Sequence, residues 1–129
     1  MSCAFIADSQ CVERFAVRLL LMQVDIEVAG EAADWSDLVA RAHSTRAELL
    51  LVDWDLLSSQ PARDIEELGY KCPGAMITVL ISHPDVERQA LIEAAGGTFL
   101  CKDATLISLW KACARRESCW PWSVRKAVK

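Results

Sequence analysis

The sequence predicts an α/β domain in which a parallel sheet carries helices on both faces. Short apolar segments alternate five times with segments of helical periodicity, which is the order expected of such a sheet. Residues 49–52, LLLV, are apolar without alternation, as is typical of a strand buried on both faces. A chain of 129 residues can bury one core and has little room for a second domain.

Five predicted strands and five predicted helices follow one another along the chain. The strands are short apolar runs, whereas the helices repeat apolar residues at steps of three and four positions. The strands cover residues 3–8, 25–29, 48–53, 75–82 and 98–103, and the helices cover about residues 11–22, 34–43, 62–68, 84–96 and 104–116.

The first helix is predicted to bury one apolar face, since charged residues separate its apolar positions. That face consists of Val12, Phe15, Ala16, Leu19 and Met22. After the second strand, residues 30–33 are expected to form a turn. Asp34 and Ser36 are both suitable caps for the second helix, because a short side-chain oxygen accepts hydrogen bonds from the open amides of a first turn.

The third strand runs into two acids, Asp53 and Asp55, and a polar loop interrupted by Pro61 follows it. The short third helix is expected to end at Gly69. Pro84 suits the first turn of the fourth helix, where its missing amide leaves no donor unsatisfied. The residues expected to be buried are Val86, Ala90, Leu91 and Ala94 in the fourth helix, which ends at Gly96 or Gly97, and Leu106, Leu109, Trp110 and Cys113 in the last.

Charge and hydropathy limit the classes of function that the chain is expected to have. The net charge is −4, but six Lys and Arg face one acid from Lys111 onward, so an acidic body carries a short basic tail. General nucleic-acid binding by the domain is therefore not expected. No apolar run approaches the ~20 residues of a membrane span and no signal peptide is evident, which predicts a cytoplasmic protein. We expect a domain over residues 1–116 and an irregular tail over residues 117–129.

The six cysteines do not indicate a zinc site or a disulfide framework. They form no C-x-x-C pair, and the chain has only two histidines to complete a metal site. We expect most of them to be small buried hydrophobic residues.

Four predicted strands end on groups that can handle phosphate: Asp8, Asp53, Ser82 and Lys102. Ligands of open parallel sheets bind beyond the carboxyl ends of the strands, so these groups are expected to meet. A carboxylate can accept a phosphoryl group, and such transfer requires cations that neutralise the phosphoryl oxygens.

With these residues, positions 3 to about 114 resemble the receiver domain of two-component response regulators. The segments DIEVAGEA, residues 25–32, and FLCKDA, residues 99–104, are similar to receivers that precede helix-turn-helix output domains. The resemblance implies a flavodoxin-like, doubly wound sheet of five strands in the order 2-1-3-4-5. It also implies a signalling phosphoacceptor rather than an enzyme, at most with self-catalysed phosphoryl transfer and autodephosphorylation.

The resemblance assigns roles residue by residue. Asp53 matches the phosphoacceptor, Ser82 the switch hydroxyl, Phe99 the switch aromatic residue and Lys102 the invariant lysine. Mg²⁺ is expected at Asp8, Asp53 and Asp55. The implied partner is a histidine kinase or phosphotransfer protein, and a homodimer through the last two helices and the fifth strand is a further expectation, with no membrane partner.

The departures from the family leave two hypotheses open. Ser9 stands where receivers usually have a second acid, so Mg²⁺ binding is expected to be weak, with Asp55 as partial compensation through its carbonyl or carboxylate. His83 is bulkier than the usual small residue and is expected to face solvent or cap a helix. The domain is thus a phosphoacceptor or a pseudo-receiver that binds partners without phosphorylation. A flavin or dinucleotide enzyme is disfavoured because no glycine-rich phosphate loop occurs.

Overall fold

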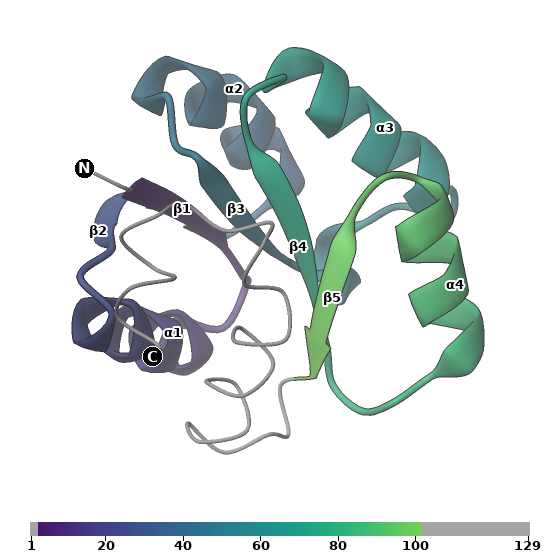
Figure 1. Ribbon diagram of the computed structural model, residues 1–129, viewed down its shortest axis with the longest axis horizontal. Helices are drawn as coiled ribbons and strands as arrows, with labels where there is room; N and C mark the ends of the chain where they lie inside the picture. Colours follow the sequence, from purple (N-terminus) through teal and green to yellow (C-terminus); the bar gives the residue numbers. More distant parts are fainter. Residues whose placement is uncertain (1–2, 102–129) are drawn as a thin grey trace.

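The computed structural model describes residues 3–101, which form a parallel five-stranded sheet with four α-helices (Figure 1). The strand order is β2-β1-β3-β4-β5, so the predicted fold class and strand order are confirmed. The predicted last helix and the tail lie outside the described residues. The elements are β1 (Cys3–Ala7), α1 (Cys11–Gln23), β2 (Glu27–Ala32), α2 (Trp35–Thr45), β3 (Leu49–Asp53), the 3-10 turn η1 (Trp54–Leu56), α3 (Pro61–Lys71), β4 (Met76–Ile81), α4 (Val86–Ala94) and β5 (Thr98–Cys101).

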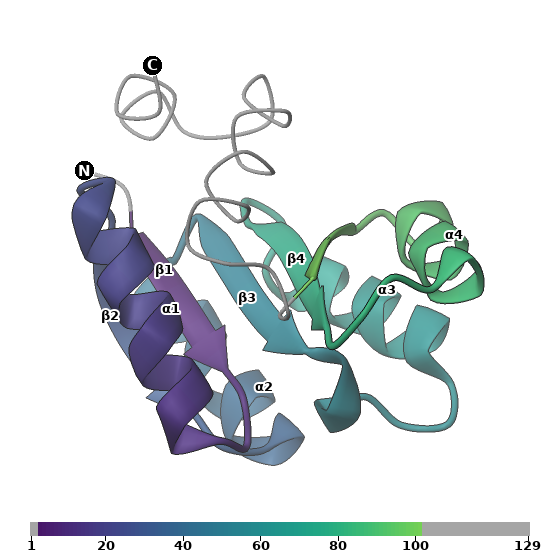
Figure 2. The ribbon, with the colours of Figure 1, turned by 90° about the horizontal axis from the view of Figure 1, so that it is seen from below.

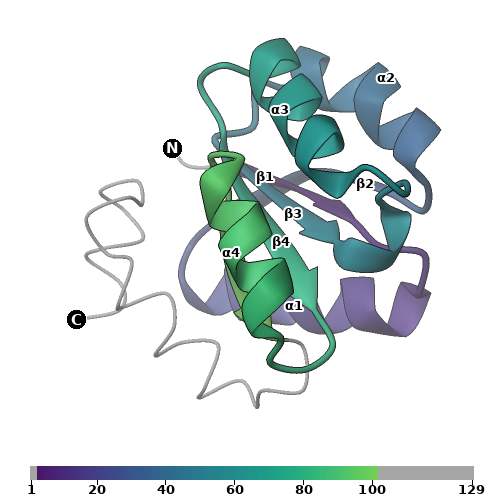
Figure 3. The same cartoon turned by 90° about the vertical axis from the view of Figure 1, so that its right-hand side faces the viewer.

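The sheet separates two apolar layers. Helix α1 lies on one face, and α2, α3 and α4 cover the other (Figures 2 and 3). Strand β3 serves both layers, because successive side chains of a strand point to opposite faces: Leu50 and Val52 join the core under α2 to α4, whereas Leu49 and Leu51 join the core under α1. The prediction of a strand buried on both faces is confirmed. No helix of the described residues is long and apolar enough to cross a membrane.

Strand β2 begins later than predicted and includes Gly30, which we had expected in a turn. The pairing of β1 with β2 shifts its register at this point. A Cβ atom on Gly30 would lie 2.7 Å from Cε2 of Phe5, and the guanidinium of Arg41 lies 5.5 Å from the centroid of the same ring. The glycine therefore makes room for a buried aromatic ring, and its apparent turn character was misleading.

The apolar face of α1 was predicted wrongly. Leu20 and Leu21 are buried against the sheet, and Val17 packs beside them. The residues that the periodicity selected point to solvent: Val12, Phe15, Leu19 and Met22 are exposed, as is Ala16. Both faces of the helix carry apolar residues at helical spacing, so periodicity alone does not say which one meets the sheet.

Helix α3 starts at Pro61 and continues through Gly69 to Lys71, so the predicted end at Gly69 was wrong. The aliphatic residues Ile65 and Leu68 anchor the helix in the core. Pro61 occupies the first turn, where it lacks only an amide that the helix does not use. Burial of one face thus outweighs the unfavourable helix propensity of a single glycine.

The ends of α2 and α4 are set by capping residues. Asp34 accepts a hydrogen bond from the Asp37 amide at 2.8 Å, which confirms one of the two predicted caps. In α4 the cap is Asp85, which accepts from the Arg88 amide at 3.1 Å, so Pro84 precedes the helix rather than lying in its first turn. The left-handed Gly96, with φ of 95°, follows the end of α4 as predicted.

The buried face of α4 also differs from the prediction. Val86 is 81% exposed, and Ile92 is the fully buried residue of the helix. Ala90 and Ala94 are exposed, and Leu91 is half-buried. Ile92 packs in the same core cluster as Ile65 and Leu68 of α3, so contact with the core, rather than helical period, selects the buried face.

The described cysteines divide between core and surface. Cys72 is buried as expected, and burial raises the pKa of its thiol. Cys11 is exposed at the start of α1, and Cys3 and Cys101 are half-buried, so among the described cysteines the expectation of burial holds for Cys72 alone.

Candidate functional site

Two acids meet at the carboxyl edge of the sheet. Asp8 directly follows β1, and Asp53 is the last residue of β3. The two strands are neighbours with Ala7 opposite Val52, so both acids emerge side by side, as the sequence predicted. Asp8 is fully buried and Asp53 is 2% exposed. Two buried carboxylates at one point are costly unless a cation or hydrogen bonds compensate them.

A third acid, Glu13, joins this pair and was missed in the sequence. One carboxylate oxygen from each of Asp8, Glu13 and Asp53 lies within 4.8 Å of the others. Glu13 belongs to the first turn of α1, and α1 begins just beyond the end of β1. An acid in the first turn of a helix that follows a strand end in this way is the signal that would have found it.

Asp55 and Ser9, unlike the buried Asp8 and Asp53, are exposed to solvent. Asp55 is exposed in η1, and Ser9 is exposed in the loop after β1. The described acidic cluster includes neither residue. That Asp55 contributes its backbone carbonyl to a metal site stays a prediction.

Backbone contacts hold Asp8 in place. Its carboxylate accepts a hydrogen bond from the Gln10 amide at 2.9 Å, and its own amide donates to the Ala32 carbonyl at 3.0 Å. Its carbonyl accepts from Nη1 of Arg14 at 2.6 Å. These contacts from β2 and α1 fix the turn that carries the acid, which is the kind of support that a binding group requires.

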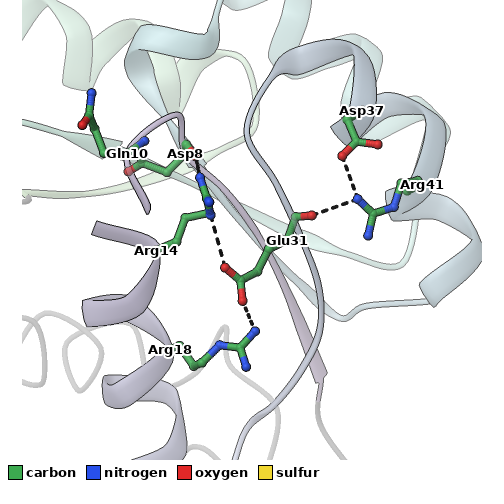
Figure 4. A network of polar contacts seen from close by, with 7 residues as sticks. All are labelled: Asp8, Gln10, Arg14, Arg18, Glu31, Asp37 and Arg41. Carbon is green, nitrogen blue, oxygen red and sulfur yellow. Dashed lines mark hydrogen bonds and ion pairs between the residues drawn. The ribbon is translucent and has the colours of Figure 1, made fainter. Parts of the chain in front are cut away.

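A network of arginines ties α1, β2 and α2 together beside the acids (Figure 4). Nε of Arg14 lies 3.2 Å from Oε1 of Glu31, and Arg18 pairs with the other oxygen of the same carboxylate. Arg41 of α2 donates to the Glu31 carbonyl at 2.9 Å and pairs with Asp37 at 2.7 Å. Glu31 binds both arginines of α1, so its single negative charge offsets one of their two positive charges next to the acidic cluster.

The acidic cluster fits a small divalent cation. Mg²⁺ prefers oxygen ligands in octahedral geometry at about 2.1 Å, so two opposite ligands are about 4.2 Å apart. At most one pair of the three carboxylates can be opposite, and neighbouring ligands are about 3 Å apart, so carboxylates within 4.8 Å of one another would hold the ion after side-chain adjustment or partly through water. Hard carboxylate oxygens without sulfur or imidazole favour Mg²⁺ over zinc.

The predicted switch residues lie on the next two strands. Ser82 directly follows β4 and is exposed, two residues beyond Leu80, which pairs with Asp53. Phe99 of β5 is half-buried and packs against the core. His83 is exposed as expected. Lys102 lies outside the described residues.

Trp54, which directly follows β3, connects that strand to α4. Its ring packs against the core, and the guanidinium of Arg88 lies 4.8 Å from its centroid. Nε of Arg88 also pairs with Asp85 at 3.3 Å. A cation stacked on a tryptophan contributes roughly 0.5–1 kcal/mol at a site open to solvent, so this contact couples the segment after Asp53 to the start of α4.

Comparison with known proteins supports the same fold. No protein-family model matches the chain. A curated relative, the uncharacterized transcriptional regulatory protein YxjL of Bacillus subtilis, is 29% identical over 119 residues. The match covers 88% of this chain and 54% of YxjL, so the chain spans about half the length of that relative.

Solved structures of receivers superimpose along most of the chain. The isolated receiver domain of RcsB from Salmonella enterica serovar Typhimurium matches with a TM-score of 0.79, 20% identity and 99% coverage of both chains. The chemotaxis protein CheY4 of Vibrio cholerae matches with a TM-score of 0.74 and 21% identity over 89% of this chain and 98% of its own. The chain therefore has the fold of response regulator receiver domains.

Proposed function

We propose that the chain is a receiver domain that accepts a phosphoryl group on Asp53 in phosphorelay signalling. The observation that carries this proposal is the cluster of Asp8, Glu13 and Asp53, whose carboxylate oxygens lie within 4.8 Å of one another at the carboxyl edge of the sheet. In open α/β sheets this edge is the place for ligands. The phosphoryl donor is a histidine kinase or a phosphotransfer protein, as the resemblance implies.

In the proposed reaction, an oxygen of Asp53 attacks the phosphorus of the donor. The bond between phosphorus and the donor atom breaks as the aspartyl phosphate forms, and water later hydrolyses it. Asp8, Glu13, Asp53 and the carbonyl of Asp55 would hold Mg²⁺, and the ion would neutralise charge on the phosphoryl oxygens. Ser82 would donate a hydrogen bond to the phosphoryl group and Lys102 would pair with it.

The proposed output is a change of shape on the face that β5 and the neighbouring helices form. A phosphoryl group adds negative charge and strong hydrogen-bond acceptors, which can reorient Ser82 and Phe99. The contact between Trp54 and Arg88 gives α4 a second connection to the acceptor strand. Which process this change of shape regulates depends on the whole protein or on its partners.

Phosphorylation with a small phosphodonor tests the proposal. Acetyl phosphate and Mg²⁺ should add one phosphoryl group, detected by intact-protein mass spectrometry, and Asp53→Asn should abolish the addition. Asp25→Asn is the matched control, because it removes an exposed acid that precedes β2, and asparagine tolerates its positive φ of 58°. Phosphorylation that persists in Asp53→Asn would contradict the assignment.

The alternative is a pseudo-receiver that binds partners without phosphorylation, and the observation in its favour is Ser9. Isothermal titration of Mg²⁺ into the wild type and Ser9→Asp separates the two functions. If the wild type neither binds Mg²⁺ at millimolar concentration nor accepts phosphate while Ser9→Asp does both, the pseudo-receiver is the correct function. Binding by the wild type supports the phosphoacceptor, with Glu13 supplying the acid that Ser9 lacks.

A further inference from the structure

A pocket of about 220 Å³ lies at the amino edge of the sheet, where β3 and β4 begin. It is lined by the ends of α2 and α3 and by the loops that lead from these helices into the two strands (Figure 1). The acidic cluster lies at the opposite, carboxyl edge, and the five residues of β3 put roughly 15 Å between the two edges. This amino-edge pocket is therefore separate from the proposed phosphorylation site.

Small side chains form most of the wall of the amino-edge pocket. They leave space because none of them is large enough to fill it. A Cβ atom added to Gly74 would still meet nothing within 4 Å. The small and apolar lining residues are Ala42, Ala47, Cys72, Pro73, Gly74 and Ala75.

Arg46, which also lines the pocket, has an unusual backbone conformation. It is the C-cap of α2 with φ of 55°, and its amide donates to the His43 carbonyl at 3.2 Å. Glycine is the common residue at a left-handed helix end, because residues with a Cβ atom are strained there. A strained residue that persists points to a role beyond the local fold, and in Arg46 the side chain is the part that glycine lacks.

The guanidinium of Arg46 has no partner among residues 3–101. Every other Lys or Arg side chain in this range is in an ion pair, except that of Arg63, which donates a hydrogen bond to Gln60. A guanidinium binds a carboxylate through two parallel hydrogen bonds. His43, exposed in the last turn of α2, lines the same pocket. A ligand with a carboxylate would therefore find donors here.

The two helix ends at the pocket limit the charge of such a ligand. Helices α2 and α3 both end there, and the C-terminal end of a helix carries about −0.5 of an elementary charge. Two such ends offset much of the charge of Arg46. A phosphate dianion is therefore disfavoured, whereas a single carboxylate can be held by directional hydrogen bonds, with an apolar body against the apolar wall.

We propose that the amino-edge pocket binds a small monocarboxylate, with its carboxylate on Arg46 and its apolar body against Cys72 and the alanines. The volume of about 220 Å³ is below the ~300 Å³ at which sites for drug-sized molecules begin. The ligand is thus limited to about ten non-hydrogen atoms. So few atoms support a dissociation constant on the order of 1 mM.

Titration of benzoate into the ¹⁵N-labelled full chain tests the proposal by NMR. The amide signals of Ala47, Gly74 and Ala75 should shift and saturate with a dissociation constant of about 1 mM. Benzamide, which has the same shape without the charge, and inorganic phosphate should leave these signals unchanged. The proposal is overturned if benzoate causes no saturable shift at these residues, or if benzamide causes the same shift.

Two variants separate the side chain of Arg46 from its backbone conformation. Arg46→Gln should weaken benzoate binding at least tenfold, because it removes the charge. Arg63→Gln makes the same change at an exposed arginine of α3 outside the pocket and should have no effect. Arg46→Gly should also lose binding but raise the urea midpoint, because glycine is unstrained at positive φ. Benzoate binding that survives in both Arg46 variants overturns the proposal.

Alkylation of Cys72 by iodoacetamide gives a measurement on the unaltered protein. Burial raises the pKa of this thiol, so the reaction is followed at alkaline pH, where part of the thiol is ionised. Saturating benzoate should slow alkylation of Cys72 several-fold and leave that of the exposed Cys11 unchanged, as measured by peptide mass spectrometry. Equal rates at Cys72 with and without benzoate would place the ligand elsewhere and overturn the proposal.

Discussion

Glu13 is the single residue that most changes the expected chemistry of the site. Receivers usually have a second acid where this chain has Ser9, and the structure places Glu13 beside Asp8 and Asp53 instead. A ligand from the first turn of a helix reaches the strand end without a change in the strand itself. The site thus keeps three carboxylates although the usual acidic pair is absent.

Glu13→Gln is predicted to weaken Mg²⁺ binding at least tenfold, because an amide offers a neutral ligand where a carboxylate offers a charged one. Isothermal titration calorimetry measures the affinity. The control is Glu87→Gln, which makes the same change in the first turn of α4, away from the acidic cluster. Equal affinity of Glu13→Gln and the wild type would show that Glu13 does not contact the ion.

Gly30 is predicted to be intolerant of alanine, because an added Cβ would lie 2.7 Å from Cε2 of the buried Phe5 ring. Overpacking of this kind costs about 1–3 kcal/mol. Urea unfolding should show that loss for Gly30→Ala and a change near zero for Gly74→Ala, whose added atom meets nothing within 4 Å. Equal stability of both variants would mean that the ring moves aside freely.

The sequence was sufficient to predict the acids of the cluster that lie at strand ends, but it was not sufficient to predict the acid that lies on a helix. Asp8 and Asp53 could be predicted because a parallel sheet brings the carboxyl ends of neighbouring strands together. Glu13 was missed because helical periodicity alone assigns a charged residue between apolar positions to an exposed site. The turn of the chain between β1 and α1 decides where the Glu13 side chain points. The periodicity of the helix carries no information about that turn.

At the level of single elements, two glycines at the ends of helices have opposite roles. Gly69 lies within α3, where an added Cβ makes an ordinary 3.6 Å contact with Ile77. Gly69→Ala should therefore stabilise the protein by about 0.5–1 kcal/mol. Gly96 follows α4 with φ of 95°, and Gly96→Ala should destabilise it by about 1–2 kcal/mol, since L-residues are strained there.

Urea unfolding of the two glycine variants checks both signs in one experiment. Neither site is crowded: nothing lies within 4 Å of an added Cβ at Gly96. A difference between the variants therefore reports backbone conformation and helix propensity rather than packing. Destabilisation by Gly69→Ala would mean that α3 ends before this residue in solution, as the sequence had suggested.

Element type was easier to predict than element boundaries or buried faces. Each described strand and helix occurs where an apolar run or a helical period predicted one. Gly30 was assigned to a turn because glycine is common in turns, although here it makes room for a ring. The faces of α1 and α4 were misassigned because alternative apolar sets share the same period, and contact with the sheet selects between them.

For the whole molecule, binding at the carboxyl edge should be linked to stability. The acids of the cluster come from β1, α1 and β3, so an ion bound there joins three elements that unfolding separates. A ligand that binds only the folded state stabilises it by about 1.4 kcal/mol at ten times its dissociation constant. Thermal unfolding should therefore shift upward with Mg²⁺ in the wild type.

The same thermal measurement on Asp53→Asn provides the comparison. The shift with Mg²⁺ should be much smaller in this variant, because the amide no longer contributes a charged ligand. NaCl at matched ionic strength controls for general screening of the acidic protein. An equal shift with NaCl, or in Asp53→Asn, would place the effect outside the acidic cluster.

Strand order is a property of the whole chain, and it could be predicted only through the resemblance. Alternation of strands and helices indicates a parallel sheet, but several orders satisfy it. The segments DIEVAGEA and FLCKDA supplied the order 2-1-3-4-5, which the structure confirms. Lys102 and the last predicted helix lie beyond the described residues, so these assignments stay predictions.

The contact between Gly30 and Phe5 also constrains how this sequence can diverge. A larger residue at position 30 requires a smaller one at position 5, because a Cβ atom and the phenyl ring cannot share the same space. Arg41, whose guanidinium lies 5.5 Å from the ring centroid, loses its aromatic partner in the same exchange. Homologues with this fold should therefore vary at these three positions together, with glycine at the first accompanying an aromatic residue at the second.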